Sequence, residues 1–362
     1  MNSETARRTI DAEIWKLYKH FNIADNFPII ECANFIYDNL KPAISHESIL
    51  ERLQTIHTYR RQLKFLMETP QVKQRSPEWF EMRTERLTAS STAQAIGKGK
   101  FGNRNQLLQS KAFPENEKWT AQTSGPMYHG TMLEAMTSRC YSQRNNDMVI
   151  HDFGMIKHPD LYCYGASPDG ITELGIMIEI KTPYRRVVDG NIPEEYMLQM
   201  QGQMAACGFK ECEFVDCKID IIQTESAYTT LIDANLNIDH GIIIEHRDEK
   251  GNPIFEYSPE YLSPTGCIQW KKDYQQKMLE SKDTRFTKTT YWKLHKIIAT
   301  HVNFNQELWD NLVPQIKQFW EDVLTLRKNP PAVVSTKKTT SKSSGTKNNE
   351  ASSYNFIDSD ED

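Results

Sequence analysis

The sequence predicts an α/β protein in which a central set of strands is flanked by helices. Apolar residues recur every three or four positions over about the first 70 residues, which indicates amphipathic helices. Short apolar runs between residues 149 and 221 indicate strands. A hairpin pattern and further helical repeats follow residue 240. With 362 residues, 38% of them hydrophobic, the chain is long enough for two domains or for one large domain with additions.

Residues 1–74 are expected to form a helical N-terminal extension. Helices are predicted over residues 10–21, over residues 30–40, and from Ser45 to Leu66. The third of these helices carries a basic face made of Arg52, Arg60, Arg61 and Lys64. We expect this face to be solvated, and contact with nucleic acid is the alternative.

Residues 75–239 contain the elements expected to form the central sheet and its neighbouring helices. Helices are predicted over residues 77–86, near Ser90, over residues 130–141, and over residues 193–207. Gly208 follows the last of these helices, as is typical of a helix C-terminus. Strands are predicted over residues 149–157, 161–166, 176–181 and 213–221.

Residues 240–331 are expected to pack on this core as a hairpin followed by helices. Residues 249–252 have the composition of a hairpin turn between two apolar runs. One helix is predicted around Trp292, Leu294, Ile297 and Ile298, and another over residues 308–326. Residues 332–362 are polar and end in acidic residues, so we expect a disordered, solubilising tail. Docking of the acidic tip on a partner protein is the alternative.

Composition excludes several classes of protein. No apolar run approaches the roughly 18 residues needed to span a membrane, and the first 15 residues lack the apolar segment of a secretory signal. Cys207, Cys212 and Cys217 are spaced unlike zinc ligands, so we expect reduced thiols in a cytosol-like compartment. The net charge of -5 argues against a basic coat protein, although a local basic groove still permits phosphate contacts.

Two short motifs contain the predicted chemistry. Ser-Pro-Asp-Gly at residues 167–170 is followed, after eight residues, by Glu-Ile-Lys at residues 179–181. Glu179 and Lys181 are two residues apart on a predicted strand, so both project from one face. Together with Asp169, the carboxylates suit a hard cation such as Mg²⁺, and the lysine suits the control of an attacking water. This combination supports metal-assisted phosphodiester hydrolysis, although single charged turns and strand ends are common.

Three further motifs accompany this pair in the chain. They are Trp-Phe-Glu-Met-Arg at residues 79–83 with Leu-Thr-Ala-Ser at 87–90, His-Gly through Glu at 129–134, and Tyr-Met-Leu-Gln-Met-Gln at 196–201. In this order the motifs resemble those of the PD-(D/E)xK nucleases, and more closely those of the phage lambda-type exonucleases and the YqaJ-type viral recombinase nucleases. The resemblance covers about residues 75–225. It implies a restriction-endonuclease-like core, which is a central mixed β-sheet flanked by helices.

The resemblance also implies a role for each matching residue. Metal ligands would be Glu134, Asp169, Glu179 and the Ile180 carbonyl, while Lys181 would orient or deprotonate the attacking water. Gln199 would position that water or a phosphate. The 5′-phosphate and the DNA would be held by Arg83, Ser90, Ser167, Tyr196, and either Arg185 or Arg186. Ordinary roles are the alternatives, such as a helix cap for Ser90 and core packing for Tyr196.

The glycine- and lysine-rich residues 97–102 do not form a phosphate-binding P-loop. In that motif the second glycine is followed by Lys and then Ser or Thr, whereas Gly102 is followed by Asn103 and Arg104. Nucleotide hydrolysis is therefore not expected. A flexible basic loop beside the path of the DNA is the interpretation we favour, and a plain surface loop is the alternative.

The function implied by the resemblance is a DNA exonuclease that uses Mg²⁺, with Mn²⁺ as a substitute and two ions at the site. It would digest one strand of duplex DNA 5′→3′ and leave 3′ overhangs for viral recombination, repair or replication. An endonuclease or single-strand nuclease of the same fold, and a catalytically silent DNA-end-binding protein, are the alternatives. Implied partners are double-stranded DNA ends, further copies of the chain (related enzymes form trimers), and a single-strand annealing or replication protein. The expected location is the cytoplasm of a virus- or phage-infected cell, without membrane attachment or secretion.

Overall fold

The computed structural model describes residues 3–21, 28–41, 43–100, 102–114, 124–233, 238–249, 251–280 and 285–330. The predicted tail of residues 332–362 lies outside the described residues, as do Phe101 and Lys250 of two predicted loops. Within the described ranges, no helix is long and apolar enough to cross a membrane.

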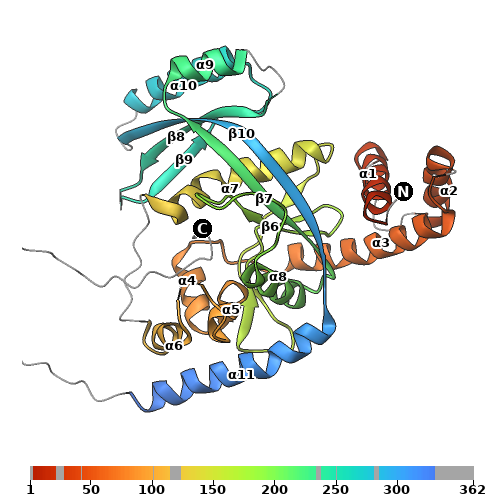
Figure 1. The fold of residues 1–362 in the computed structure, drawn as a ribbon, viewed down its shortest axis with the longest axis vertical. Helices are drawn as coiled ribbons and strands as arrows, with labels where there is room; N and C mark the ends of the chain where they lie inside the picture. The colour runs from red at the N-terminus through yellow and green to blue at the C-terminus, as the bar shows by residue number, and fades with distance from the viewer. Residues whose placement is uncertain are drawn as a thin grey trace, which may run out of the picture.

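Three helices form the N-terminal extension, as predicted (Figure 1). They are α1 (Ser3–Phe21), α2 (Ile29–Leu40) and α3 (His46–Glu68). The third begins after Ser45, whose hydroxyl accepts a hydrogen bond of 3.2 Å from the backbone N–H of Ser48. Such a cap satisfies one of the backbone donors that a helix start leaves without a partner.

The remaining elements are helices and strands, which occur partly in consecutive runs of one type. The helical segments are α4 (Pro77–Thr84), η1 (Ala89–Ser91), α5 (Thr92–Ala95), α6 (Arg104–Ala112), α7 (Gly125–Arg144), α8 (Glu194–Cys207), α9 (Glu225–Asp233), α10 (Pro264–Glu280) and α11 (Gln306–Lys328). The strands are β1 (Leu87–Thr88), β2 (Ile150–His151), β3 (Ile156–Lys157), β4 (Tyr164–Ala166), β5 (Gly170–Thr172), β6 (Met177–Lys181), β7 (Glu211–Ile222), β8 (His240–Arg247), β9 (Pro253–Tyr257) and β10 (Arg285–Asn303). Gly208 ends α8 in the left-handed conformation, with φ at 78°, as its position in the sequence predicts.

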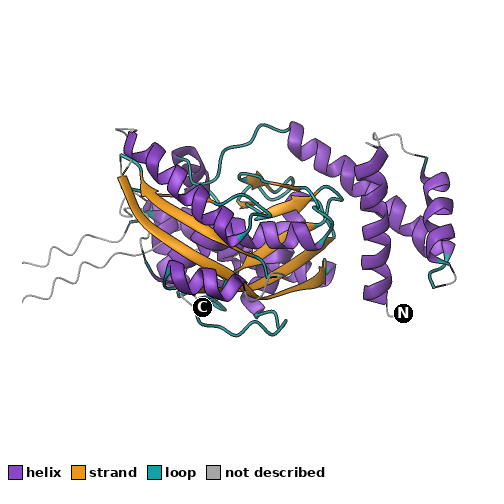
Figure 2. Cartoon of the chain, turned by 90° about the horizontal axis from the view of Figure 1, so that it is seen from above, coloured by secondary structure: helices purple, strands orange, loops and turns teal. Residues whose placement is uncertain are grey.

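The main sheet is mixed and has seven strands among the described residues, in the order β2-β5-β6-β7-β10-β8-β9. Among the described strands of this sheet, β6 and β7 pair in parallel and the other neighbours are antiparallel. A second sheet has the order β1-β4-β3. Helices lie along both faces of the strands, with the N-terminal helices to one side (Figure 2). The predicted architecture of a mixed sheet flanked by helices is therefore confirmed.

The helix predicted around Trp292 is wrong, because this segment is the long strand β10. It pairs with β7 on one side and with β8 on the other, and it runs beside β7 across the molecule (Figure 1). The pairing shifts between Leu294 and Lys296, where a bulge inserts one residue. Trp292, Leu294 and Ile297 consequently contact one apolar cluster despite their uneven spacing. The resulting interval of three residues resembles the period of a helix.

The single strand predicted over residues 149–157 is also wrong, since β2 and β3 belong to different sheets. Gly154 lies between them and passes close to the chain at Val72. A Cβ atom on Gly154 would lie 1.7 Å from the carbonyl oxygen of Val72, so only glycine fits there. Strand β5, which follows Asp169 directly, was not predicted from the sequence, and neither were helices α9 and α10.

The N-terminal helices share a hydrophobic core with the main sheet. Buried residues of this core include Ile14, Ile36 and Leu53 from the helices and Met177 and Phe214 from β6 and β7. The predicted solvated basic face is only partly correct. Arg60 pairs with Glu173 at 2.6 Å, and Arg52, in the same helix, is 9% exposed. The extension therefore packs on the main sheet through apolar contacts and ion pairs.

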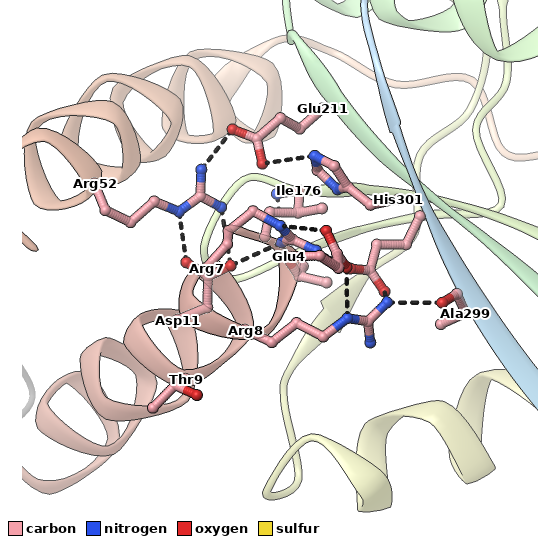
Figure 3. Close-up of polar contacts among 12 residues, drawn as sticks. Glu4, Arg7, Arg8, Thr9, Asp11, Arg52, Ile176, Glu211, Ala299 and His301 are labelled. Carbon is pink, nitrogen blue, oxygen red and sulfur yellow. Dashed lines mark hydrogen bonds and ion pairs between the residues drawn. The ribbon is translucent and has the colours of Figure 1, made fainter. Parts of the chain in front are cut away.

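A buried network of charges joins the helices to β7, and we call it the Arg52 cluster (Figure 3). Its members are Arg7, Asp11, Arg52, Glu211 and Glu213. Arg52 contacts both oxygens of Asp11, at 2.6 and 2.9 Å, and Glu211 at 2.5 Å. Arg7 contacts Asp11 at 2.9 Å and Glu213 at 2.8 Å. Each carboxylate thus faces a guanidinium that supplies several donors.

The predicted segment boundaries divide elements that pair with one another. β7 lies before residue 240, and its neighbour β10 lies after it. The division at residues 74/75 likewise separates helices that share one hydrophobic core with the sheet. Whether these segments behave as separate units stays a prediction.

Candidate active site

The turn at residues 167–169 lies next to β6. Asp169 directly precedes β5, which pairs with β6. One oxygen of the Asp169 carboxylate accepts a hydrogen bond of 2.7 Å from the backbone N–H of Ile180. Because Ile180 lies between Glu179 and Lys181, this bond fixes Asp169 beside both residues of the second motif.

Glu179 is completely buried and is surrounded by donors. One of its oxygens accepts from the Gln199 amide at 2.7 Å and lies 2.7 Å from the Lys181 ammonium. The other oxygen accepts from the Gln203 amide at 2.6 Å. Burial of an ionised carboxylate costs several kcal/mol unless such partners compensate for the lost water. We call these four residues and Asp169 the Glu179 cluster.

Both amides come from helix α8. Gln199 and Gln203 are four residues apart and therefore lie on one face of the helix, so both reach the Glu179 carboxylate. Tyr196 precedes them by one turn. Its ring stacks on Phe214, and the Lys181 ammonium lies 4.9 Å from the ring centroid. Tyr196 is 1% exposed, which disagrees with a direct contact to DNA and agrees with the packing alternative.

A polar recess opens beside the Glu179 cluster. The residues that line it are Gln74, Arg75, Trp79, Arg83, Thr88, Ala89, Ser90, Glu134, Ser167, Asp169, Lys181, Gln199 and Gln203. Seven of these were predicted from the sequence as site residues: Arg83, Ser90, Glu134, Ser167, Asp169, Lys181 and Gln199. Residues that are more than 100 positions apart in the chain therefore meet around one opening.

Trp79 contacts two of the residues predicted to hold a phosphate, Arg83 and Ser167. The indole N–H of Trp79 donates to the Ser167 hydroxyl at 2.9 Å, and the Arg83 guanidinium lies 4.4 Å from the centroid of the indole. The Ser90 hydroxyl lies 3.2 Å from that of Thr88. Trp79 is itself buried, so it forms a rigid support for a positive charge and hydroxyl donors, which together suit a terminal phosphate.

The two arginines after Lys181 are not placed at this recess. Arg186 forms two hydrogen bonds with Asp216, at 2.7 and 2.8 Å, and Asp216 is fully buried. Arg185 lies 5.8 Å from the ring centroid of Tyr184. Neither arginine lines the recess, which disagrees with the expectation that one of them holds the 5′-phosphate.

Four polar residues of the recess were missed by the sequence analysis: Gln74, Arg75, Thr88 and Gln203. Gln203 could have been found, because it lies one helical turn after Gln199. Thr88 lies within a quoted motif but was given no role. Gln74 and Arg75 precede the first motif, in the connection between α3 and α4, and no local pattern marks them.

The residues fit a hard divalent cation by their chemistry. Glu134 and Asp169 line the recess, and Glu179 is hydrogen-bonded to three of its lining residues. The carboxylates of Glu134, Asp169 and Glu179 would all bind a metal ion through oxygen, the ligand atom that Mg²⁺ and Mn²⁺ prefer. Among the residues that the structure describes, no three acidic, His or Cys side chains already form a metal-binding group. Lys181, Gln199 and Gln203 hold the Glu179 carboxylate beside the recess.

The fold and the recess define a mixed α/β protein with a carboxylate, lysine and glutamine site at β6. Residues 78–210 match the family model of the YqaJ-like viral recombinase domain, so the resemblance predicted from the motifs is confirmed over this segment. The chain is also similar to the uncharacterized protein R354 of Acanthamoeba polyphaga mimivirus, with 25% identity over 331 residues. That alignment covers 78% of this chain and 59% of the mimivirus protein, so the chain spans about three fifths of its relative.

Two solved structures resemble the chain more distantly. One is an alkaline exonuclease, LHK-Exo, from Laribacter hongkongensis, with a TM-score of 0.44 and 19% identity over 70% of this chain and 95% of the other. The other is a phage-related exonuclease from Haemophilus somnus 129PT, with a TM-score of 0.37 and 12% identity over 67% of this chain and 95% of the other.

Proposed function

We propose that the protein is a metal-dependent DNA exonuclease that digests one strand of a duplex from its 5′ end. The observation that supports this most is the shared recess: Asp169, Glu134 and Lys181 line the same opening as Arg83 and Ser167. The first three residues suit phosphodiester hydrolysis, and the last two suit a terminal phosphate. The match of residues 78–210 to a viral recombinase domain supports DNA as the substrate.

The chain's own residues would divide the work. Glu134, Asp169, Glu179 and the Ile180 carbonyl would hold Mg²⁺ or Mn²⁺, which when bound polarises the phosphate and lowers the pKa of a coordinated water. Lys181 is held by Glu179 and would orient the attacking water or take its proton. Gln199 and Gln203 hold Glu179 from the other side and would keep its carboxylate in position.

The polarity of digestion would follow from the phosphate-binding side of the recess. Arg83, Ser90 and Ser167 would bind the 5′-terminal phosphate and so place the next phosphodiester bond beside Asp169 and Lys181. Hydrolysis there releases a nucleotide with a 5′-phosphate and leaves a new 5′-phosphate on the shortened strand. The opposite strand would remain as a 3′ overhang, ready for annealing.

The biological setting belongs to the same proposal. We infer double-stranded DNA ends as the partner and the cytoplasm of an infected host cell as the location, supported by the mimivirus relative. A homo-oligomer around the DNA and a single-strand annealing or replication protein as consumer of the overhang complete the proposal.

Strand polarity tests this function directly. Linear blunt duplex, labelled on either the 5′ or the 3′ end of one strand, is incubated with the protein and Mg²⁺, with covalently closed circular duplex as the control. We expect immediate release of the 5′ label as a mononucleotide, late loss of the 3′ label, and an intact circle. Rapid nicking of the circle would replace the proposal with an endonuclease.

A further inference from the structure

The connection between α3 and α4 forms part of the rim of the recess. The Gln74 amide donates to the carbonyl of Phe153 at 2.8 Å and to that of Pro168 at 3.3 Å. The second of these bonds ties the connection to the turn that contains Asp169. The connection precedes residue 78, so it lies outside the segment that matches the family model.

A wider groove continues from the recess past this connection. Gln74, Arg75, Glu134 and Asp169 line both spaces. On its other side the groove is lined by the β8–β9 hairpin, through Asp248, Asn252, Pro253 and Ile254. The shared residues therefore lie where the site meets a space large enough to receive more of a bound strand.

Arg75 occupies this meeting point. One nitrogen of its guanidinium lies 3.1 Å from an oxygen of Glu134, the carboxylate that faces the recess from α7. The side chain of Arg75 is 47% exposed and that of Glu134 is 35% exposed. The backbone of Arg75 is left-handed, with φ at 63°, which non-glycine residues adopt rarely. An exposed arginine in this position can exchange partners without disturbing the core.

We propose that Arg75 is the resident counter-ion of the metal site, and that it exchanges Glu134 for a DNA phosphate when a cation binds. The inference rests on the proposed function. A divalent cation attracts the Glu134 carboxylate and repels the guanidinium, so the two compete for the same oxygens. The displaced guanidinium then points to the groove, where a phosphate offers the bidentate partner that arginine favours.

The competition between Arg75 and the cation for Glu134 is tested by titrating the protein with Mn²⁺ in the absence of DNA. Free Mn²⁺ is measured by electron paramagnetic resonance. Arg75→Gln should bind Mn²⁺ about two- to fivefold more tightly than the wild type, the range that a partly exposed ion pair allows. Arg75→Lys should fall between the two. A gain of affinity cannot result from damaged folding, which would lower it.

Two variants make the titration specific. Arg144→Gln is the matched control, because Arg144 is 43% exposed, is paired with Asp239, and lines neither the recess nor the groove. Its Mn²⁺ affinity should equal that of the wild type. Glu134→Gln should bind Mn²⁺ more weakly, and adding Arg75→Gln to it should give no gain. A gain in this double variant would overturn the competition for Glu134.

If Arg75 then binds a DNA phosphate, a change of Arg75 should also lower the affinity for DNA. In Ca²⁺, which we expect to support binding with little cleavage, Arg75→Gln should bind a 5′-phosphorylated duplex more weakly by fluorescence anisotropy. The slope of log affinity against log salt should fall by about 0.9, the value for one phosphate contact. An unchanged slope would overturn the exchange onto DNA.

The outcomes separate this inference from the proposed function. A wild type that is folded and binds no Mn²⁺ overturns the proposed function and with it the inference. A wild type that binds Mn²⁺, with Arg75→Gln equal to it or weaker, overturns the role of Arg75 and leaves the proposed function standing.

Discussion

Two buried clusters of charge lie on neighbouring strands and are built in different ways. In the Arg52 cluster, Glu211 and Glu213 of β7 face guanidinium groups from α1 and α3. In the Glu179 cluster, the carboxylate on β6 receives two neutral amides and one ammonium. The parallel strands β6 and β7 are paired, so the difference lies in the partners and not in the depth of burial.

The choice of partner decides what each cluster can do. Every carboxylate of the Arg52 cluster contacts a guanidinium, which compensates for its burial and opposes the approach of a further cation. Amides also satisfy a buried carboxylate, but they leave its charge in place. Among the described residues that line the recess, three are cations: Arg75, Arg83 and Lys181. A buried carboxylate that is held by two neutral amides and one ammonium beside an open recess is suited to a metal ion, whereas the Arg52 cluster is suited to joining two parts of the fold.

The largest difference between the clusters should be seen in turnover. Asp169→Asn keeps the shape of the side chain and removes a metal-binding charge. We expect the single-turnover rate on duplex DNA to fall about a thousandfold or more, with DNA affinity and melting temperature nearly unchanged. Lys181→Ala should lose a similar factor, and combining the two changes should cost little more, because such residues act as a unit.

A matched control for these variants is Asp310→Asn. Asp310 lies on the exposed side of α11, and the contact described for it is a hydrogen bond from Gln306. Its rate should equal that of the wild type. A rate for Asp169→Asn within tenfold of the wild type would contradict the assignment of the Glu179 cluster.

The opposite behaviour is expected when the Arg52 cluster is broken. Arg52→Met leaves Asp11 and Glu211 buried with a partner removed, which costs about 3–5 kcal/mol of the free energy of unfolding. Urea denaturation measures this loss, and the cleavage rate per folded molecule should stay within threefold of the wild type. Lys41→Met, which removes an exposed pair with Asp38, should leave stability nearly unchanged. A stable Arg52→Met protein would show that the cluster does not hold the N-terminal helices.

The phosphate side of the recess should give a smaller effect that depends on the substrate. The wild type should degrade 5′-phosphorylated duplex faster than 5′-hydroxyl duplex, because Arg83 offers a charge-assisted bond to the phosphate. Arg83→Gln should remove most of that preference, about tenfold, while the rate on the 5′-hydroxyl duplex stays close to that of the wild type. Equal rates of the wild type on both ends would exclude a 5′-phosphate pocket.

The smallest expected effect is a dependence of stability on pH. Burial opposes ionisation of Glu211, but the hydrogen bond and the charge of Arg52 outweigh it and hold the pKa of Glu211 below its usual value of 4.5. A lowered pKa in the folded state stabilises the protein above pH 4.5, and this contribution is lost as the pH falls below 4.5. For this one carboxyl group, the free energy of unfolding changes by at most about 1.4 kcal/mol per pH unit.

Comparison of the wild type with Glu211→Gln isolates this contribution. The difference in the free energy of unfolding between the two proteins, measured between pH 5 and pH 3, should shrink as the pH falls. A constant difference would show that the charge of Glu211 does not contribute to the stability of the Arg52 cluster.

The two clusters also differ in how far the sequence predicts them. Four of the five residues of the Glu179 cluster stand in the sequence motifs, so Asp169, Lys181 and Gln199 could be predicted without a structure. Gln203 lies two residues beyond the last motif and was not predicted. Arg52 was predicted to lie on a solvated face, because its buried partners Asp11 and Glu211 are 41 and 159 residues away in the chain. Only tertiary packing reveals such a pair.

The same limit explains the errors in the fold. The bulge in β10 alters the spacing of Trp292, Leu294 and Ile297, and no local signal distinguishes that spacing from a helix. Arg75 reaches the site from a connection without a motif, through a contact with a helix 59 residues further along the chain. The local periodicity of apolar residues predicts most helices and strands, whereas contacts between distant segments are seen only in the folded structure.

The central claim is that the recess beside Glu179 hydrolyses DNA with a divalent cation. The direct measurement is the rate of nucleotide release from blunt, 5′-phosphorylated duplex by the wild type, in Mg²⁺, in Mn²⁺ and in EDTA. We predict digestion in either metal, none in EDTA, and recovery when Mg²⁺ is returned in excess. Undiminished digestion in EDTA, or no digestion in any metal by folded protein that binds the duplex, would contradict the claim.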